Sequence, residues 1–345
     1  MSQKKLEKVN SIIIQKGLSP ELYYEQKYLK EEWEELCSRE EIYWRKKSHE
    51  LWLRDGNKNT IFFHETARVK RAVNTIFSIK HSESGHLIED DNGIKEEGVR
   101  FFSNLLAPPH LDPIDDNLIN DFISCIPPLI TADHNRMLLA PFTLEEIKKV
   151  VSSFPPDKAP GPDGFTALFY QKCWDFIGSD LLAVVEESRR NAKMIRSFNS
   201  TNIAIIPKVK QPTSFADFRP ISLCNMVYKL ITKAIYMRLQ KFIPHIISLD
   251  QGGFVPGRET WEGVVVAHET LHSINSHQLS SFVIKLDMMK AYDRVRWLFL
   301  FKVISKFGFS DKWCRWIKNC ISGAWFSVIV NGESIGFFPS SQGIR

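Results

Sequence analysis

FVIKLDMMKAYDRV, residues 282–295, combines a largely apolar run with two aspartates, and these features restrict the fold more than any others. The run from Phe282 to Leu286 predicts a strand buried on both faces, and it ends abruptly at Asp287. An unpaired buried carboxylate is costly, so Asp287 is expected at the exposed end of the strand, hydrogen-bonded or bound to a metal ion. Asp293 follows it closely.

Carboxylates at the edge of a sheet fit two interpretations. In a two-metal phosphoryl-transfer site, carboxylates hold two Mg²⁺ ions that stabilise the attacking and leaving oxygens of an in-line displacement. In the alternative, Asp287 caps the following helix and Asp293 pairs with Arg296. The spacing alone favours the alternative, so the surrounding sequence has to decide.

Helical and strand patterns are mixed on both sides of this stretch. From Thr143, a Thr N-cap and Glu146 three residues later predict an amphipathic helix with a capping box. Residues 202–209 predict a strand, and residues 222–247 a long amphipathic helix. Residues 326–338 predict a hairpin with an Asn-Gly turn. This mixture, with an antiparallel hairpin, predicts an α+β fold.

The first third of the chain shows a different pattern. Residues 1–60 predict helix, with an end near the turn signal Asp55-Gly56. Residues 72–95 predict a hairpin, followed by a second turn at Asp91-Asn92-Gly93. The Pro- and Asp-rich stretch 107–118 is the best candidate for a linker.

The bulk composition is that of a globular protein. Hydrophobic residues make up 43%, charged residues 25%, and the net charge of +5 permits a polyanionic partner without requiring one. The six cysteines form no Cys-x-x-Cys pair, so neither a zinc site nor a disulfide framework is expected. No signal peptide or membrane-spanning run is evident, and an intracellular, soluble protein is expected.

Motifs along most of residues 30–345 resemble, in order and spacing, those of LINE-type (non-LTR) retrotransposon reverse transcriptases, especially those of plants. KLDMMKAYDRVRWLFL is similar to the motif in which the first Asp binds catalytic metal. The upstream region EEIYWRKKSHELWLRDGNKNTIFFHETARVKR resembles a connector that joins an endonuclease to the polymerase. The other matching segments are PPDKAPGPDGFTALFYQKCW (155–174), IAIIPKV (203–209), FADFRPISLCNMVYKLITKAIYMRL (215–239), DQGGFVPGRET (250–260) and VIVNGESIGFFPSSQGIR (328–345).

The resemblance implies the fingers and part of the palm of a right-hand polymerase, preceded by a mainly helical connector. The implied division is a connector over 1–110, a linker and helix over 111–142, fingers over 143–280 and a partial palm over 281–345. The implied activity is RNA-directed DNA synthesis, in which a primer 3′-hydroxyl attacks the α-phosphate of a dNTP. Its partners would be an RNA template, a DNA primer and dNTP, with no membrane, and its location the nucleus.

Residue roles follow from the same resemblance. Asp287 matches the first catalytic metal ligand, for a two-ion Mg²⁺ site that is incomplete here. Arg219 and Lys208 match fingers residues that bind the incoming triphosphate, although a plain surface role for Lys208 is equally compatible. Tyr292 resembles the gate that rejects a 2′-hydroxyl; its alternative role is core packing.

Three further residues have supporting roles by the same resemblance. Lys290 and Asp293 match positions that support the metal site from outside its ligand set. Arg258 matches a contact to nucleic-acid backbone or to an acidic neighbour. Trp261 stands close to where the family often has Asp-Asn, which leaves the local fingers contacts open.

The family's Ala-Asp-Asp hairpin is expected after the catalytic strand, but no adjacent Asp pair follows Asp293. The last residues, Gly343 to Arg345, resemble the start of the motif GIRQGDPLSP. We therefore expect an N- and C-terminally truncated polymerase fragment, inactive alone, and whether this chain itself is an enzyme stays open. Two alternatives remain: a non-catalytic remnant that at most binds nucleic acid and, less favoured, a two-metal nuclease built around Asp287.

Overall fold

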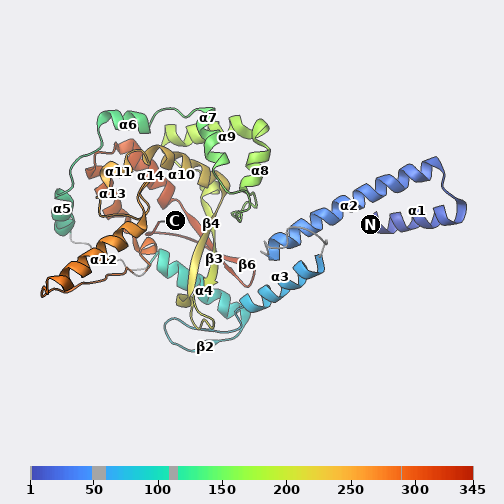
Figure 1. The fold of residues 1–345 in the computed structure, drawn as a ribbon, viewed down its shortest axis with the longest axis horizontal. Helices are drawn as coiled ribbons and strands as arrows, with labels where there is room; N and C mark the ends of the chain where they lie inside the picture. Colours follow the sequence, from blue (N-terminus) through green and yellow to red (C-terminus); the bar gives the residue numbers. More distant parts are fainter. Residues whose placement is uncertain (1, 49–59, 109–115, 289, 345) are drawn as a thin grey trace. The chain divides into compact units, whose positions relative to one another are not determined.

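The computed structural model describes residues 2–48, 60–108, 116–288 and 290–344 (Figure 1). The chain forms two compact units, residues 1–76 and residues 77–345. Their content of helices and a mixed sheet confirms the α+β class. Within the described ranges, no helix is both long enough and apolar enough to cross a bilayer.

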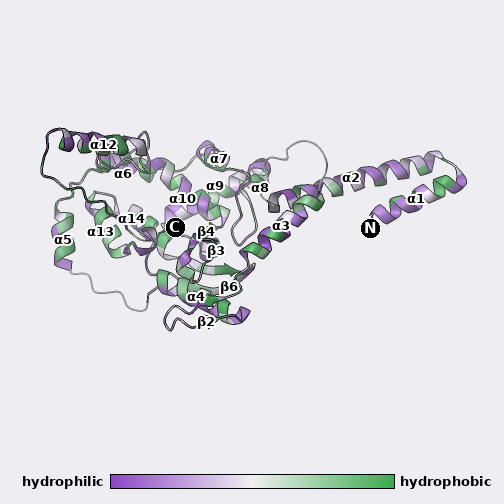
Figure 2. Cartoon of the chain, turned by 60° about the horizontal axis from the view of Figure 1, so that its bottom comes forward, coloured by the Kyte–Doolittle hydropathy of each residue, from purple (hydrophilic) through white to green (hydrophobic). Residues whose placement is uncertain are grey.

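The first unit is helical, as predicted, but its helix is interrupted. Gly17 adopts a left-handed φ of 81°, which ends one helix, and the Oγ of Ser19 accepts the Leu22 N–H at the start of the next. Much of α1 and α2 is hydrophilic (Figure 2). The predicted helix end at Asp55-Gly56 lies outside the described residues. The helices are α1 (Ser2–Lys16), α2 (Pro20–Ser48) and α3 (Thr60–Asn74).

The second unit is built around a four-stranded sheet with the strand order β4-β3-β5-β6. The central pair, β3 and β5, is parallel, and each edge strand pairs antiparallel with its neighbour. A separate two-stranded hairpin, β1-β2, precedes the sheet in the chain. The strands are β1 (Ile79–Lys80), β2 (Leu87–Ile88), β3 (Ser200–Pro207), β4 (Phe218–Cys224), β5 (Trp325–Val330) and β6 (Glu333–Pro339).

Most helices of the second unit lie above the sheet or to its left in Figure 1. The helices of this unit are α4 (Asp91–Leu106), α5 (Asp116–Ser124), α6 (Ala132–Leu138), α7 (Leu144–Ser152), α8 (Ala167–Lys172), α9 (Trp174–Asn191), α10 (Met226–Leu239), α11 (Ile243–Ile246), α12 (Thr260–Ser276), α13 (Trp297–Lys306) and α14 (Asp311–Ser322). Short 3₁₀ turns are η1 (Arg196–Asn199), η2 (Phe215–Asp217) and η3 (Tyr292–Arg294). The β1-β2 hairpin and α4, which the sequence assigns to the connector, thus belong to the compact unit that holds the sheet.

Helix α4 packs against β5 and β6. Alternate side chains of β5 are buried, including Val330, as expected for a strand with one covered face. Two glycines allow the close approach. A Cβ on Gly98 of α4 would lie 3.2 Å from Val330, and one on Gly336 of β6 would lie 2.7 Å from Val99. The helix therefore lies directly on the sheet.

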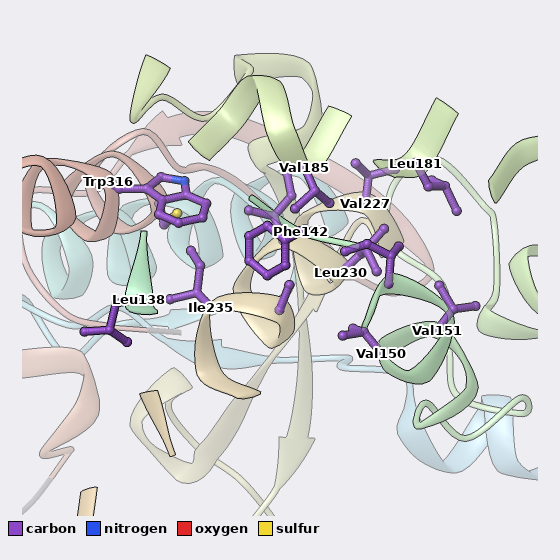
Figure 3. Close-up of a cluster of buried hydrophobic side chains, with 14 of the residues drawn as sticks. Leu138, Phe142, Val150, Val151, Leu181, Val185, Val227, Leu230, Ile235 and Trp316 are labelled. Atoms are coloured by element: carbon purple, nitrogen blue, oxygen red, sulfur yellow. The ribbon is translucent and has the colours of Figure 1, made fainter. Parts of the chain in front are cut away.

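The main hydrophobic core is formed by α6–α10 and α14 (Figure 3). Trp313 and Trp316 are almost completely buried. The indole N–H of Trp316 donates to the Ser188 hydroxyl at 2.9 Å, and its ring meets Phe142 edge-on with centroids 6.4 Å apart. The polar atom of this large side chain is thereby satisfied inside the core.

Arg238 of α10 clamps the loop between α6 and α7. Its guanidinium donates to the carbonyls of Leu138 (3.3 Å), Ala140 and Pro141 (2.9 Å), and to the Glu146 carboxylate at 3.0 Å. The predicted capping box between Thr143 and Glu146 is confirmed. Glu146 therefore closes the start of α7 while its carboxylate also binds Arg238.

Three expectations about local structure are wrong. Residues 281–288 form no strand and are exposed, with Phe282 at 85%. A strand apolar on both faces needs neighbouring strands, and no described segment pairs with this one. Asp91-Asn92-Gly93 starts α4 because Asp90 caps it, accepting the Gly93 N–H. Residues 222–224 belong to β4, which pairs with β3, so the long helix starts only at Met226.

Candidate functional site

The structure brings together three predicted site residues, Lys208, Lys290 and Asp293, with Arg294, and the charges of this group act on the pKa values of Lys290 and Asp293. Lys208 follows β3 directly, and its ammonium donates to the Ala216 carbonyl at 2.8 Å. The other three residues lie in or just before the turn η3. The end of β3 and η3 therefore form one cationic cluster around a single carboxylate.

Lys290 is the partly buried cation of this cluster. Burial lowers the pKa of its ammonium, the Lys208 and Arg294 charges lower it further, and Asp293 opposes them. Its backbone has a left-handed φ of 55°, and its carbonyl accepts the Asp293 N–H at 3.0 Å. Its Nζ lies 4.7 Å from the ring centroid of Phe101 in α4. The ammonium is thus positioned between like charges and an aromatic face.

Asp293 is half-buried beside a cavity of about 340 Å³. Burial raises the pKa of this carboxyl above its usual value, and Lys290, Lys208 and Arg294 oppose that shift. Much of the cavity wall is apolar and comes from α4, β3, α10, α14 and β5, including Phe102, Ile203, Tyr228, Ile235, Cys320 and Phe326. The carboxylate thus stands where the cationic cluster meets an apolar cavity.

The segment 340–344 holds η3 in place. The N–H groups of Gly343 and Ile344 donate to the carbonyls of Val295 and Tyr292, both at 2.9 Å. The indole N–H of Trp297 donates to the Gly343 carbonyl at 2.7 Å. A Cβ on Gly343, whose φ is 80°, would lie 2.8 Å from the Asp293 carbonyl oxygen, so glycine is required there.

Asp287 does not join this cluster in the structure. It lies in the exposed stretch before Lys290. Mg²⁺ is usually held by one or two carboxylates together with phosphate oxygens. Asp287 supplies one such carboxylate, which fits part of a Mg²⁺ site but not the ligand set of a two-ion site. Over the described ranges, no three His, Cys, Asp or Glu side chains gather as metal ligands.

The remaining predicted residues occupy separate places. Arg219 is exposed on the edge strand β4, opposite Ile206 of β3. Tyr292 is 56% exposed and meets Phe254 edge-on with centroids 6.3 Å apart. Arg258 donates to the backbone carbonyls of residue 244 in α11 and of residues 247, 248 and 251 in the loop that follows it. Its guanidinium therefore organises this loop.

Sequence reasoning missed two contributors to the site. Phe101 stands in an amphipathic helix far upstream, where a Phe-Phe pair looks like ordinary core packing. Gln342 is buried, and its side-chain amide donates to the Leu105 carbonyl at 3.0 Å. Its only sequence signal was its position immediately before Gly343.

Comparison with known proteins places these residues in a family context. Residues 206–345 match the family model described as reverse transcriptase (RNA-dependent DNA polymerase). This segment contains all seven site residues predicted from the sequence.

Two curated proteins are similar over longer ranges. The Transposon TX1 uncharacterized 149 kDa protein of Xenopus laevis is 27% identical over 294 residues, which is 84% of this chain and 22% of that protein. The retrovirus-related Pol polyprotein from type-2 retrotransposable element R2DM of Drosophila melanogaster is 21% identical over 223 residues, 64% of this chain and 20% of that protein. The chain spans about a fifth of the length of these relatives. The chain is thus similar to LINE-type (non-LTR) retrotransposon proteins, and its residues 206–345 match the reverse transcriptase family model.

Proposed function

We propose that this chain forms the fingers and part of the palm of the RNA-directed DNA polymerase of a non-LTR retrotransposon. The cationic cluster of Lys208, Lys290 and Arg294, inside the segment that matches the reverse transcriptase family, is the observation that supports this best. Clustered cations of this kind suit a nucleoside triphosphate, whose phosphates carry several negative charges. Residues 143–280 would serve as fingers and residues 281–345 as the start of the palm.

The proposed roles follow the positions of the side chains. Lys208, directly after β3, and Arg219, on the neighbouring strand β4, would bind the triphosphate, Arg219 through its two-pronged guanidinium. Tyr292, more than half exposed, would pack against the sugar. Asp287 would contribute one carboxylate to Mg²⁺, which neutralises charge on the phosphates when it is bound. Arg258 would contact nucleic-acid backbone through the loop that it organises.

These 345 residues contain no adjacent Asp pair after Asp293. A polymerase site that uses two metal ions needs further carboxylates. We therefore propose that the chain binds nucleotide and nucleic acid but does not extend a primer by itself. We also propose that the protein acts in the nucleus, as the resemblance to the family implies.

Primer extension on an RNA template with Mg²⁺ tests the polymerase assignment. Two proteins would be compared: this chain and a version continued through the Gln-Gly-Asp-Pro and Ala-Asp-Asp motifs. We expect extension only from the longer protein, and Asp287→Asn should abolish that activity. The matched control is Asp180→Asn, which changes an exposed carboxylate of α9. Absence of extension by both proteins would contradict the assignment.

A non-catalytic nucleic-acid-binding protein is the second candidate, because the cationic cluster of Lys208, Lys290 and Arg294 would suit nucleic-acid phosphates as well as a triphosphate. Titrating this chain with an RNA–DNA primer duplex at several salt concentrations tests its binding function. Binding that weakens steeply with salt is expected, because phosphate contacts release counterions. A salt slope near zero would contradict nucleic-acid binding by either candidate.

A further inference from the structure

We propose that helix α4 is part of the phosphate-binding site and that Phe101 is a positioning residue which holds the Lys290 ammonium in place. The proposal rests on the proposed function, because it deepens the role of the cationic cluster there. Helix α4 lies outside the segment that matches the family model. The role of Phe101 therefore comes from its contacts alone.

Phe101 is itself packed against other aromatic rings. It meets Phe102 edge-on with centroids 5.1 Å apart, and Phe215 lies 6.2 Å from it. Phe102 is almost fully buried, so this side of α4 is fixed by the core. Helix α4 also contacts η3, the turn that follows Lys290. The ring is thus a fixed surface next to the cluster.

The charges explain why an aromatic ring suits this position. Lys290 lies near the like charges of Lys208 and Arg294, and its burial disfavours its charged form. The Asp293 carboxylate opposes these effects on Lys290, but its influence ranks below those of burial and of Lys208. The negative face of the Phe101 ring stabilises the ammonium from one side.

A carboxylate in place of the ring would stabilise Lys290 as well, but it would occupy the N–H donors and repel an incoming anion. The ring does neither, because it attracts the cation through its quadrupole and carries no net charge. The left-handed backbone at Lys290 is also unfavourable for a non-glycine residue and persists only where its surroundings hold it. The geometry therefore favours a held, charged ammonium with its donors available to phosphate.

The test measures how fast the Lys290 amine reacts in the 345-residue chain. Acetylation by acetic anhydride is measured by mass spectrometry at a series of pH values, since only the neutral amine reacts. Phe101→Leu keeps an apolar side chain but removes the ring face. We expect the Lys290 amine to titrate at lower pH and to react about fivefold faster near neutral pH, the equivalent of a modest cation–π interaction.

Phe101→Trp provides the opposite change, because Trp binds cations more strongly than Phe. It should slow Lys290 acetylation below that of the unmodified chain, and it remains informative if the Leu variant fails to fold. Phe176→Leu is the matched control, since Phe176 is 85% exposed on α9, and it should leave Lys290 unchanged. Equal Lys290 reactivity in the unmodified chain and both folded Phe101 variants would overturn the proposal.

Three probes distinguish a failure of this inference from a failure of the proposed function: inorganic tripolyphosphate, dTTP and a primer–template duplex. Each probe should protect Lys290 from acetylation in the unmodified chain, and about fivefold more tripolyphosphate should be needed in Phe101→Leu. If no probe protects Lys290, the proposed nucleotide site is wrong, whatever Phe101 does. If the probes protect Lys290 equally in all folded variants, the nucleotide site stands and the role of Phe101 is refuted.

Discussion

Replacing Arg238 by methionine should destabilise the second unit more than removing any exposed charge. Methionine keeps most of the side-chain volume but leaves the carbonyls of Leu138, Ala140 and Pro141 without their donor. The Leu138 bond is buried and the other two are part-buried, so each carbonyl left without its donor costs about 1 kcal/mol, which gives about 3 kcal/mol for the three. The arginine side chain is only 9% exposed, so water replaces these bonds poorly.

Two further interactions of Arg238 change this value only modestly. Its guanidinium lies 3.5 Å from the ring centroid of Phe142, a contact worth about 1 kcal/mol. Glu146 is 42% exposed, so the loss of this ion pair adds at most about 1 kcal/mol. Removing the guanidinium also relieves its own burial cost, which offsets part of these losses. The net expectation stays at about 3 kcal/mol.

Urea unfolding followed by tryptophan fluorescence measures this change, because Trp316 packs against Phe142 in the same core. Arg136→Met is the control: its side chain is 80% exposed, and the variant should change the free energy of unfolding by less than about 0.5 kcal/mol. If Arg238→Met lowers the free energy of unfolding by less than about 1 kcal/mol, with an unchanged dependence on urea concentration, this stabilising role of Arg238 is refuted.

Three more predictions follow from the same structure. Leu230→Ala, at a position 1% exposed in the main core, should lower the free energy of unfolding by about 2–5 kcal/mol in urea. Gly332→Ala should cost about 1 kcal/mol in the same assay, because φ is 88° in the β5-β6 turn. Hydrogen bonding from Arg189 holds the pKa of Glu186 below its usual range, although burial opposes this. The ionised Glu186 carboxylate therefore stabilises the fold above the usual carboxyl pKa, and this stabilisation is lost as pH falls through the folded-state pKa. The variant Glu186→Gln lacks this group, so acidification should lower its stability less than that of the unmodified chain. The same acid sensitivity in both proteins would contradict this role for Glu186.

Elements specified by neighbouring residues could be predicted from the sequence. The capping box of Thr143 and Glu146 is such a case, since both partners lie within one helical turn. The Asn331-Gly332 turn is another, with both residues at positive φ as that hairpin type requires. Residues 222–224 of β4 were assigned to the following helix because the partner strand decides their structure: Phe218–Cys224 is a strand through its pairing with β3. Long-range pairing of this kind leaves little local signal.

Some residues of the candidate site could likewise be predicted from the sequence, and others could not. Lys208, Lys290 and Asp293 were predicted from motifs, and the structure places them within electrostatic reach of one another. Phe101 was not predictable, because nothing in its own helix indicates that Lys290 will lie over its ring. A cation–π contact joins residues by their spatial position, and no spacing in the sequence encodes it.

The parallel pairing of β3 with β5 has a consequence for the order of folding. Ser200 lies opposite Trp325, so the centre of the sheet joins strands about 125 residues apart in the chain. Ordering so long a connection costs entropy before the contacts repay it, and such sheets form slowly. During synthesis, the β3-β4 hairpin can form early, but one edge of β3 stays unpaired until β5 has left the ribosome. We expect this open edge to be the point at which the nascent chain is most prone to aggregate.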